Sequence, residues 1–62
     1  MWIRTIEGGW YVHEVRGAVY LSWVSEKDRE KAAQFPAKDI GNWIVILESM
    51  SGMRLQAVGC KE

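Results

Sequence analysis

The feature that most constrains the fold of this chain is a change of hydrophobic period between residues 18 and 35. In the first part of this stretch, Val19, Leu21 and Trp23 occupy every second position. A period of two is typical of a half-buried strand, because successive side chains of a strand point to opposite faces. The pattern therefore predicts a strand over about residues 18–24.

The second part of the same stretch predicts a helix. Ser25 is a candidate N-cap, and Asp28, three residues later, completes the Ser-x-x-Asp form of a capping box. Pro36 ends the helix, since the residue before a proline is pushed out of helical geometry. These signals predict a short helix over about residues 26–35.

Two turn signals precede the strand. Gly8-Gly9 is typical of a β-hairpin turn, and Arg16-Gly17 marks a second reversal of the chain. Each turn separates two segments that are rich in β-forming residues. The predicted arrangement is a three-stranded antiparallel meander with strands over about residues 2–6, 10–15 and 18–24.

The register of this meander follows by arithmetic if each turn contains two residues. Trp10 then pairs with Trp23. In the same register Val12 pairs with Leu21 and lies beside Thr5. The face interpreted as the core side carries Ile3, Thr5, Glu7, Trp10, Val12, Glu14, Val19, Leu21 and Trp23. The opposite face carries Trp2, Arg4, Ile6, Tyr11, His13, Val15, Ala18, Tyr20 and Ser22. This second face is interpreted as an apolar surface crossed by a polar row of Arg4, His13 and Tyr20.

The segment after residue 35 allows two interpretations. Residues 43–47 form an apolar run rich in β-branched side chains, which suggests a buried strand over about residues 43–48. Yet Ile40, Trp43 and Leu47 recur at helical spacing, and Gly52 suits a C-terminal cap. We favour a helix over about residues 36–50 and keep the strand as the alternative. The helix would leave Val45 and Ile46 outside its apolar stripe.

The last part of the chain alternates weakly and predicts a closing strand over about residues 53–60. Together these elements predict an α+β fold. With 62 residues there is room for a single domain over residues 1–62.

A chain this short is marginally stable as a monomer unless something reinforces it. Cys60 is the only cysteine, so no internal disulfide can form, and we interpret it as a small apolar residue on the last strand. Four tryptophans fit either an unusually good core or an oligomer interface. We therefore predict a homodimer that buries one sheet face. The residues of that face are Trp2, Ile6, Tyr11 and Val15.

Charge and chemistry narrow the functional classes. Eight basic and eight acidic residues cancel, which argues against a purely electrostatic grip on nucleic acid or on an anionic membrane. No apolar run approaches the roughly 20 residues that span a bilayer. His13 is the only histidine, and no serine has a base at suitable local spacing. We therefore predict no catalytic residue, no metal, no cofactor and no enzymatic activity. Because the single cysteine has no partner for a disulfide, we expect a reducing compartment, the cytoplasm.

The order of core and turn positions resembles a type of small protein common in tailed phages and prophages. The positions that carry the resemblance are Trp2-Ile3, Tyr11-Val12, Gly17, Trp23-Val24-Ser25, Ala32 with Phe35, residues 40–47, and residues 55–58. Small phage proteins of this size with known roles often bind and inhibit host proteins, including components of bacterial defence systems. The resemblance thus implies a phage-encoded inhibitor that acts in the host cytoplasm.

The resulting hypothesis is a non-enzymatic protein-binding module that inhibits a host protein at a fixed molar ratio. Its predicted partner and dimer interface comprises Trp2, Arg4, Ile6, Tyr11, His13, Val15, Tyr20, Val45 and Ile46. An alternative function is binding of single-stranded nucleic acid on a stacking platform. That platform would consist of Trp2, Tyr11 and Tyr20 with Arg4 and Arg16. A purely structural or assembly role is a third possibility.

Overall fold

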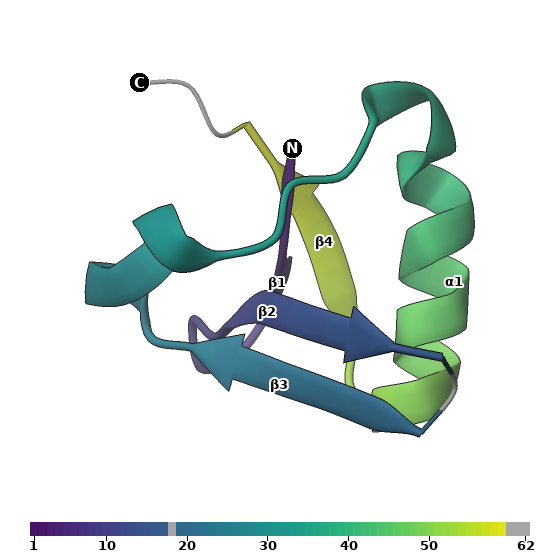
Figure 1. Cartoon of the computed structure of the whole chain (residues 1–62), viewed down its shortest axis with the longest axis horizontal. Coiled ribbons are helices and arrows are strands. Elements are labelled where there is room, and N and C mark those ends of the chain that lie inside the picture. Colours follow the sequence, from purple (N-terminus) through teal and green to yellow (C-terminus); the bar gives the residue numbers. More distant parts are fainter. Residues whose placement is uncertain (18, 60–62) are drawn as a thin grey trace.

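The computed structural model, which describes residues 1–17 and 19–59, shows four strands, two 3₁₀ segments and one α-helix (Figure 1). In chain order these are β1 (Trp2–Thr5), β2 (Tyr11–Arg16), β3 (Tyr20–Val24), η1 (Glu26–Lys31), η2 (Ala37–Asp39), α1 (Ile40–Ser51) and β4 (Leu55–Val58). The predicted α+β class is confirmed. The stretch around residues 43–48 is helical, as favoured, and the closing strand forms within its predicted range.

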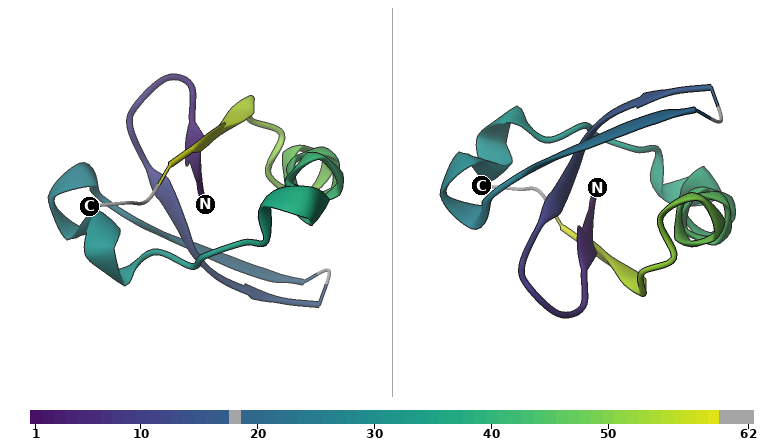
Figure 2. Two further views of the ribbon diagram at one scale, coloured as in Figure 1. Left: turned by 90° about the horizontal axis from the view of Figure 1, so that it is seen from above. Right: turned by 90° about the horizontal axis from the view of Figure 1, so that it is seen from below.

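All four strands belong to one antiparallel sheet with the order β3-β2-β1-β4. β4 therefore pairs with β1 along its whole length, from Trp2 opposite Val58 to Thr5 opposite Leu55. β1 and β2 share a single pair, between Arg4 and Tyr11. Because the join is so short, the β1–β4 pair and the β2–β3 pair cross steeply (Figure 1, Figure 2).

The predicted two-residue turns are wrong, and the predicted register is wrong with them. The first connection spans residues 6–10 and is closed by the Thr5 amide, which donates to the Trp10 carbonyl at 2.8 Å. At the second connection Arg16 pairs with Tyr20. After a one-residue shift between Val12 and Glu14, Val12 lies opposite Trp23 and not Leu21. Longer loops shift every later pair along the strands.

A β-bulge at His13 changes which side chains of β2 face the core. The pairing shifts between Val12 and Glu14, so one extra residue is accommodated on β2. Val12 and Val15, three positions apart, both pack on the core side. Val15 and Glu14 therefore lie on the faces opposite to those predicted.

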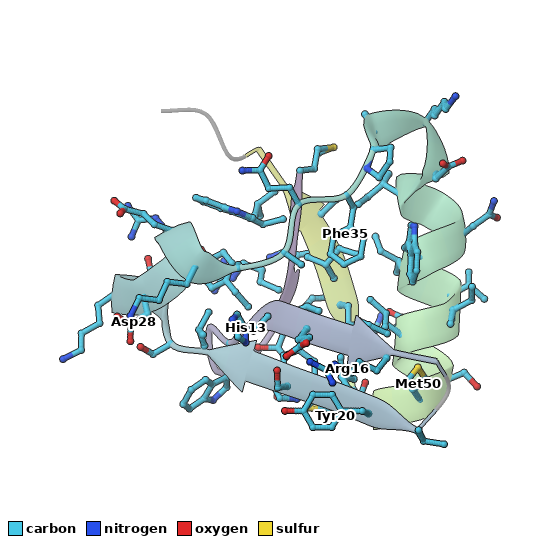
Figure 3. The ribbon with its side chains drawn as sticks, in the orientation of Figure 1. His13, Arg16, Tyr20, Asp28, Phe35 and Met50 are labelled. Atoms are coloured by element: carbon cyan, nitrogen blue, oxygen red, sulfur yellow. The ribbon has the colours of Figure 1, made fainter. Side chains whose placement is uncertain are left out.

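The core lies between the sheet and α1. Its buried members are Ile3, Val12, Phe35, Leu47 and Leu55, with Val15, Leu21, Trp23, Ala33, Ile40, Trp43, Ile44 and Met50 packed around them. Figure 3 shows Phe35 inside the space that the sheet and α1 enclose. Glu7, Trp10 and Val19, predicted on the core face, are exposed because they lie in the connections; Trp10 is 48% and Val19 92% accessible.

The predicted capping box does not form. The Ser25 side chain makes no hydrogen bond to the backbone of η1; its hydroxyl donates to the Asp28 carboxylate at 3.4 Å instead. The helix is a 3₁₀ segment that ends at Lys31 rather than near residue 35. Beyond Lys31 the backbone amides form hydrogen bonds with distant parts of the chain instead of continuing the helix. The Ala33 amide donates to the Val12 carbonyl at 3.0 Å, and the Phe35 amide donates to the Met1 carbonyl at 2.8 Å.

α1 ends as predicted. Gly52 takes the left-handed conformation, with φ of 72°, and its amide donates to the Glu48 carbonyl at 2.8 Å. Pro36 precedes the first turn, η2, rather than occupying its first helical position. The Phe35 ring, 5.2 Å from the Trp43 ring, anchors the incoming chain to α1.

Candidate functional site

Three of the predicted interface residues form a cluster on the outer side of the sheet. The Trp2 ring meets the Tyr11 ring edge-on, with centroids 5.6 Å apart. The Arg4 guanidinium lies 5.7 Å from the Tyr11 ring centroid. Tyr11 is consequently only 6% accessible, so its ring is a packing element rather than a presented surface.

The predicted polar row of Arg4, His13 and Tyr20 is not formed. The His13 Nδ1 atom lies 3.2 Å from the Ser22 hydroxyl, across the β2–β3 pair. Arg16 pairs with the Glu14 carboxylate at 2.6 Å, and its guanidinium lies 5.9 Å from the Tyr20 ring centroid. The outer face of the β2–β3 hairpin is therefore polar and internally paired (Figure 3).

Of the four residues predicted to form the dimer face, the structure brings Trp2 and Tyr11 together but not Ile6 and Val15. Trp2 and Tyr11 belong to the outer cluster, Val15 packs against the core, and Ile6 lies in the connection after β1. Their predicted common face depended on a regular alternation through β2. The bulge and the longer first connection interrupt that alternation.

Two predicted residues, Val45 and Ile46, lie on the outer face of α1 and are 67% and 50% accessible. The other exposed residues of this helix are Gly41, Asn42 and Ser49, so its outer face carries no charge. Glu48, the only charged residue of α1, is half-buried, and its carboxylate accepts the Leu55 amide at 2.9 Å. The outer face of α1, defined by these five exposed residues, is an uncharged surface with two aliphatic side chains at its centre.

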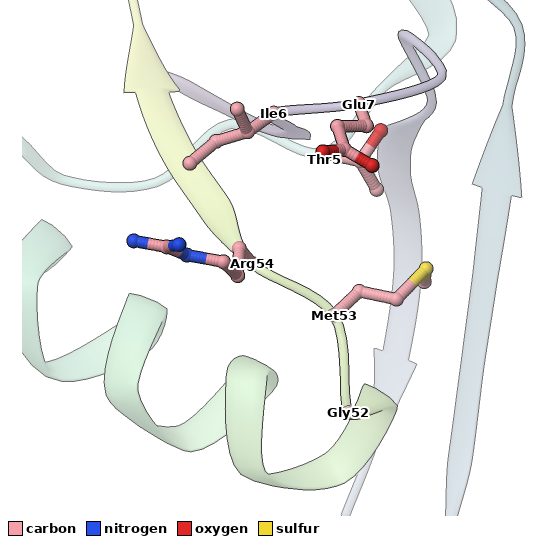
Figure 4. Close-up of a pocket in the computed structure, with 6 residues that line it drawn as sticks. All are labelled: Thr5, Ile6, Glu7, Gly52, Met53 and Arg54. Carbon is pink, nitrogen blue, oxygen red and sulfur yellow. The ribbon is translucent and has the colours of Figure 1, made fainter.

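A pocket of about 320 Å³ opens between the inner side of β3 and the end of α1. Its walls are Val19, Leu21, Trp23, Met50, Ser51 and Met53. A second pocket of about 460 Å³ lies between the β1–β2 connection and the segment after α1 (Figure 4). It is lined by Thr5, Ile6, Glu7, Gly52, Met53 and Arg54. Met53 lines both pockets.

The sequence analysis did not predict the surface around Met50 and Met53 that borders these two pockets. Met53 is exposed, and Met50 is half-buried at the wall of the pocket. The sequence did contain a signal for the exposure of Met53. This residue directly follows the C-cap Gly52, where the chain leaves the helix, so the helix does not cover its side chain. Methionine suits such a site because its unbranched, polarisable side chain adapts to different partners.

No family model matches this chain, and comparison with curated proteins and with solved structures likewise found no match. In the part of the chain that the structure describes, no helix is long and apolar enough to cross a membrane. Within residues 1–17 and 19–59, no group of three or more histidine, cysteine, aspartate or glutamate residues is placed to hold a metal ion.

Proposed function

We propose that this protein is a small non-enzymatic protein-binding module that inhibits its partner by occupying a surface. The observation that carries the proposal is the outer face of α1. An exposed helix face without a charged residue is unusual, since charged side chains normally occupy the solvent side of an amphipathic helix. Two neighbouring exposed aliphatic residues on an uncharged face make this face the candidate interaction site of the chain.

The chemistry of this face defines what would bind it. Burying Val45 and Ile46 removes apolar area from water, and no ion has to be desolvated in the process. Gly41 and Ser49 lie one helical turn before and after Val45, and a Cβ added at Gly41 would meet none of the described residues within 4 Å. Their small size lets a partner backbone approach closely. The expected partner surface is an apolar, uncharged groove or helix.

In its finer form the proposal is a phage-encoded inhibitor of a host protein, acting as a homodimer in the host cytoplasm. Support for this form comes from the resemblance to small phage proteins and from the exposed apolar surface of the chain. Nucleic-acid binding is supported less well, because the Tyr11 ring is buried and Arg16, beside Tyr20, is already paired with Glu14.

The experiment is capture of the partner from a bacterial lysate, followed by titration of the purified partner. Wild type is compared with Ile46→Lys and with Glu30→Lys, a control that also changes charge but lies on the exposed side of η1. A lysine forced into the interface should weaken binding by about 2 kcal/mol, roughly thirtyfold. The control should bind as wild type does.

Inhibition by the wild-type protein should saturate at a fixed molar ratio. Inactivation of many partner molecules by one molecule of this protein would contradict the proposal and indicate turnover. Equal capture by wild type and Ile46→Lys would show that the outer face of α1 is not the binding surface.

A further inference from the structure

We infer that the free edge of β3 is the dimer contact, where it pairs with β3 of a second copy across a two-fold axis at Ser22. The inference deepens the proposed function, on which it rests for the expectation of a homodimer. It assigns dimerisation and partner binding to different surfaces. β3 lies at the border of the sheet, away from the outer face of α1 (Figure 1).

The first observation is that β3 is an edge strand, so some of its backbone N–H and C=O groups point away from β2. Among the strands that the structure describes, β2 is its only neighbour in the sheet. Among the described residues, no backbone hydrogen bond reaches residues 20–24 from outside that pairing. An edge strand of this kind presents a row of open donors and acceptors to any strand that can approach it.

The second observation is that this edge lacks the usual protection against such pairing. Natural edge strands carry lysine or another charge, a proline or a bulge. β3 has the sequence Tyr-Leu-Ser-Trp-Val, with neither a charge nor a proline, and the bulge of this hairpin lies on β2. When β3 pairs with β3 of a second copy, no like charges repel each other. A strand of a different protein would gain no attraction between opposite charges at this edge.

The third observation is the incomplete cover of the inner side of β3. Leu21 and Trp23 pack against the core but are only partly buried, and the pocket of about 320 Å³ lies between them and the end of α1. A strand added at the free edge would extend the same inner face. Its apolar side chains would then lie at the mouth of that pocket, beside Met50 and Met53.

Symmetry selects the register of the added strand. A two-fold axis normal to the sheet must pass between two copies of the same residue, because directly opposed residues in an antiparallel pair share a face. Ser22 is the middle residue of β3, so an axis there gives the longest overlap. It places Leu21 opposite Trp23 of the second copy on the inner side. On the outer side Tyr20 faces Val24, and the two Ser22 residues face each other.

The test places charges at this axis. Two lysines at position 22 would stand directly opposite each other, and like charges in a cross-strand pair are destabilising. We expect sedimentation analysis over micromolar to millimolar concentrations to show a concentration-dependent dimer for wild type. Ser22→Lys and Ser22→Glu should each dissociate roughly tenfold more readily. Mixing the two variants should restore a dimer, because the opposed charges then attract.

Ser49→Lys and Ser49→Glu on the outer face of α1 are the matched controls, and they should dimerise as wild type does. Circular dichroism and thermal melting of each variant report the monomer fold separately, because Ser22 also contacts His13.

A monomeric wild type, an unaffected Ser22→Lys dimer, or a mixture that stays monomeric would each overturn the inference. A monomeric wild type that still inhibits its partner at a fixed ratio would overturn this inference and leave the proposed function intact. A Ser22-dependent dimer that binds no partner would support the inference and contradict the proposed function.

Discussion

The Glu48 carboxylate accepts a hydrogen bond from the Leu55 backbone amide at 2.9 Å, which ties the last turns of α1 to the first residue of β4. β4 is an edge strand, and Leu55 is one of the buried core residues. The only charge of the helix is thus used inside the fold, and the outer face of α1 is left without one.

We predict that Glu48→Ala destabilises the fold by about 1–2 kcal/mol, because the Leu55 amide loses a charged acceptor in a part-buried place. Glu48→Gln keeps a neutral acceptor at the same position and should lose about half as much. Urea unfolding curves of the three proteins measure the difference. Equal stability of Glu48→Ala and wild type would mean that this bond contributes nothing.

Leu47 and Val45 test which side of α1 faces the core. Leu47 is fully buried, whereas Val45 is exposed. Leu47→Ala should cost about 2–5 kcal/mol, which approaches the whole stability of a small domain. Val45→Ala should stay within roughly 0.5 kcal/mol. Thermal melts of the two variants measure the loss of stability. A larger loss for Val45→Ala than for Leu47→Ala would show that Val45, and not Leu47, faces the core.

Trp10 and Trp23 test the strand register in the same way. Trp23 packs against the core opposite Val12, while Trp10 lies half-exposed at the end of the first connection. Trp23→Ala should destabilise by about 2–3 kcal/mol, at or below the lower end for a core aromatic residue because Trp23 is only partly buried. Trp10→Ala should cost clearly less. Comparable losses would favour the register in which the two tryptophans pair.

Two glycines of the helical region should respond in opposite directions. Gly52 has a φ of 72°, which an alanine side chain disfavours, so Gly52→Ala should destabilise by about 1 kcal/mol. Gly41 lies inside α1 with open space around it, so Gly41→Ala should stabilise by about 0.5–1 kcal/mol. Chemical denaturation of both variants provides the measurement. Stabilisation by Gly52→Ala would rule out the left-handed cap.

Labelled single-stranded DNA should show no saturable binding at low or at moderate salt. Net charge is zero, and the Tyr11 ring is covered by Trp2 and Arg4. Fluorescence anisotropy at two salt concentrations is the measurement. Binding that weakens steeply with salt would instead support the nucleic-acid alternative, since release of counterions from phosphate produces that dependence.

Local pattern was sufficient for the strands and for the end of α1. Strand positions follow from alternation and from β-forming residues, which act over neighbouring positions of the chain. Gly52 ends α1 because a residue without a Cβ takes the left-handed conformation at little cost. The same helical spacing correctly left Val45 and Ile46 outside the apolar stripe.

Only the tertiary structure decided the register and the facing of β2. Two consecutive polar residues, His13 and Glu14, separate Val12 from Val15, but a strand without a bulge would place these two valines on opposite faces. Only the folded structure shows the bulge that brings both to one side. A bulge and a longer loop are selected by how well the whole inner face packs, which involves Leu47, Phe35 and β4 from the far end of the chain. For this reason Val15 packs against the core and does not join Trp2 and Tyr11 on the predicted interface.

The segment after β3 shows the same division. Helix-forming signals over residues 26–35 were real but weak, and a short helix is marginal without tertiary support. Ala33 and Phe35 found backbone partners in Val12 and Met1, which held the chain extended and ended the helix at Lys31. The sequence by itself determined where the chain could form strands and helices. Contacts between residues far apart in the sequence decided where each element ended and which side chains stayed on the surface. The reason is that such a hydrogen bond or apolar contact outweighs a local preference of a few tenths of a kcal/mol.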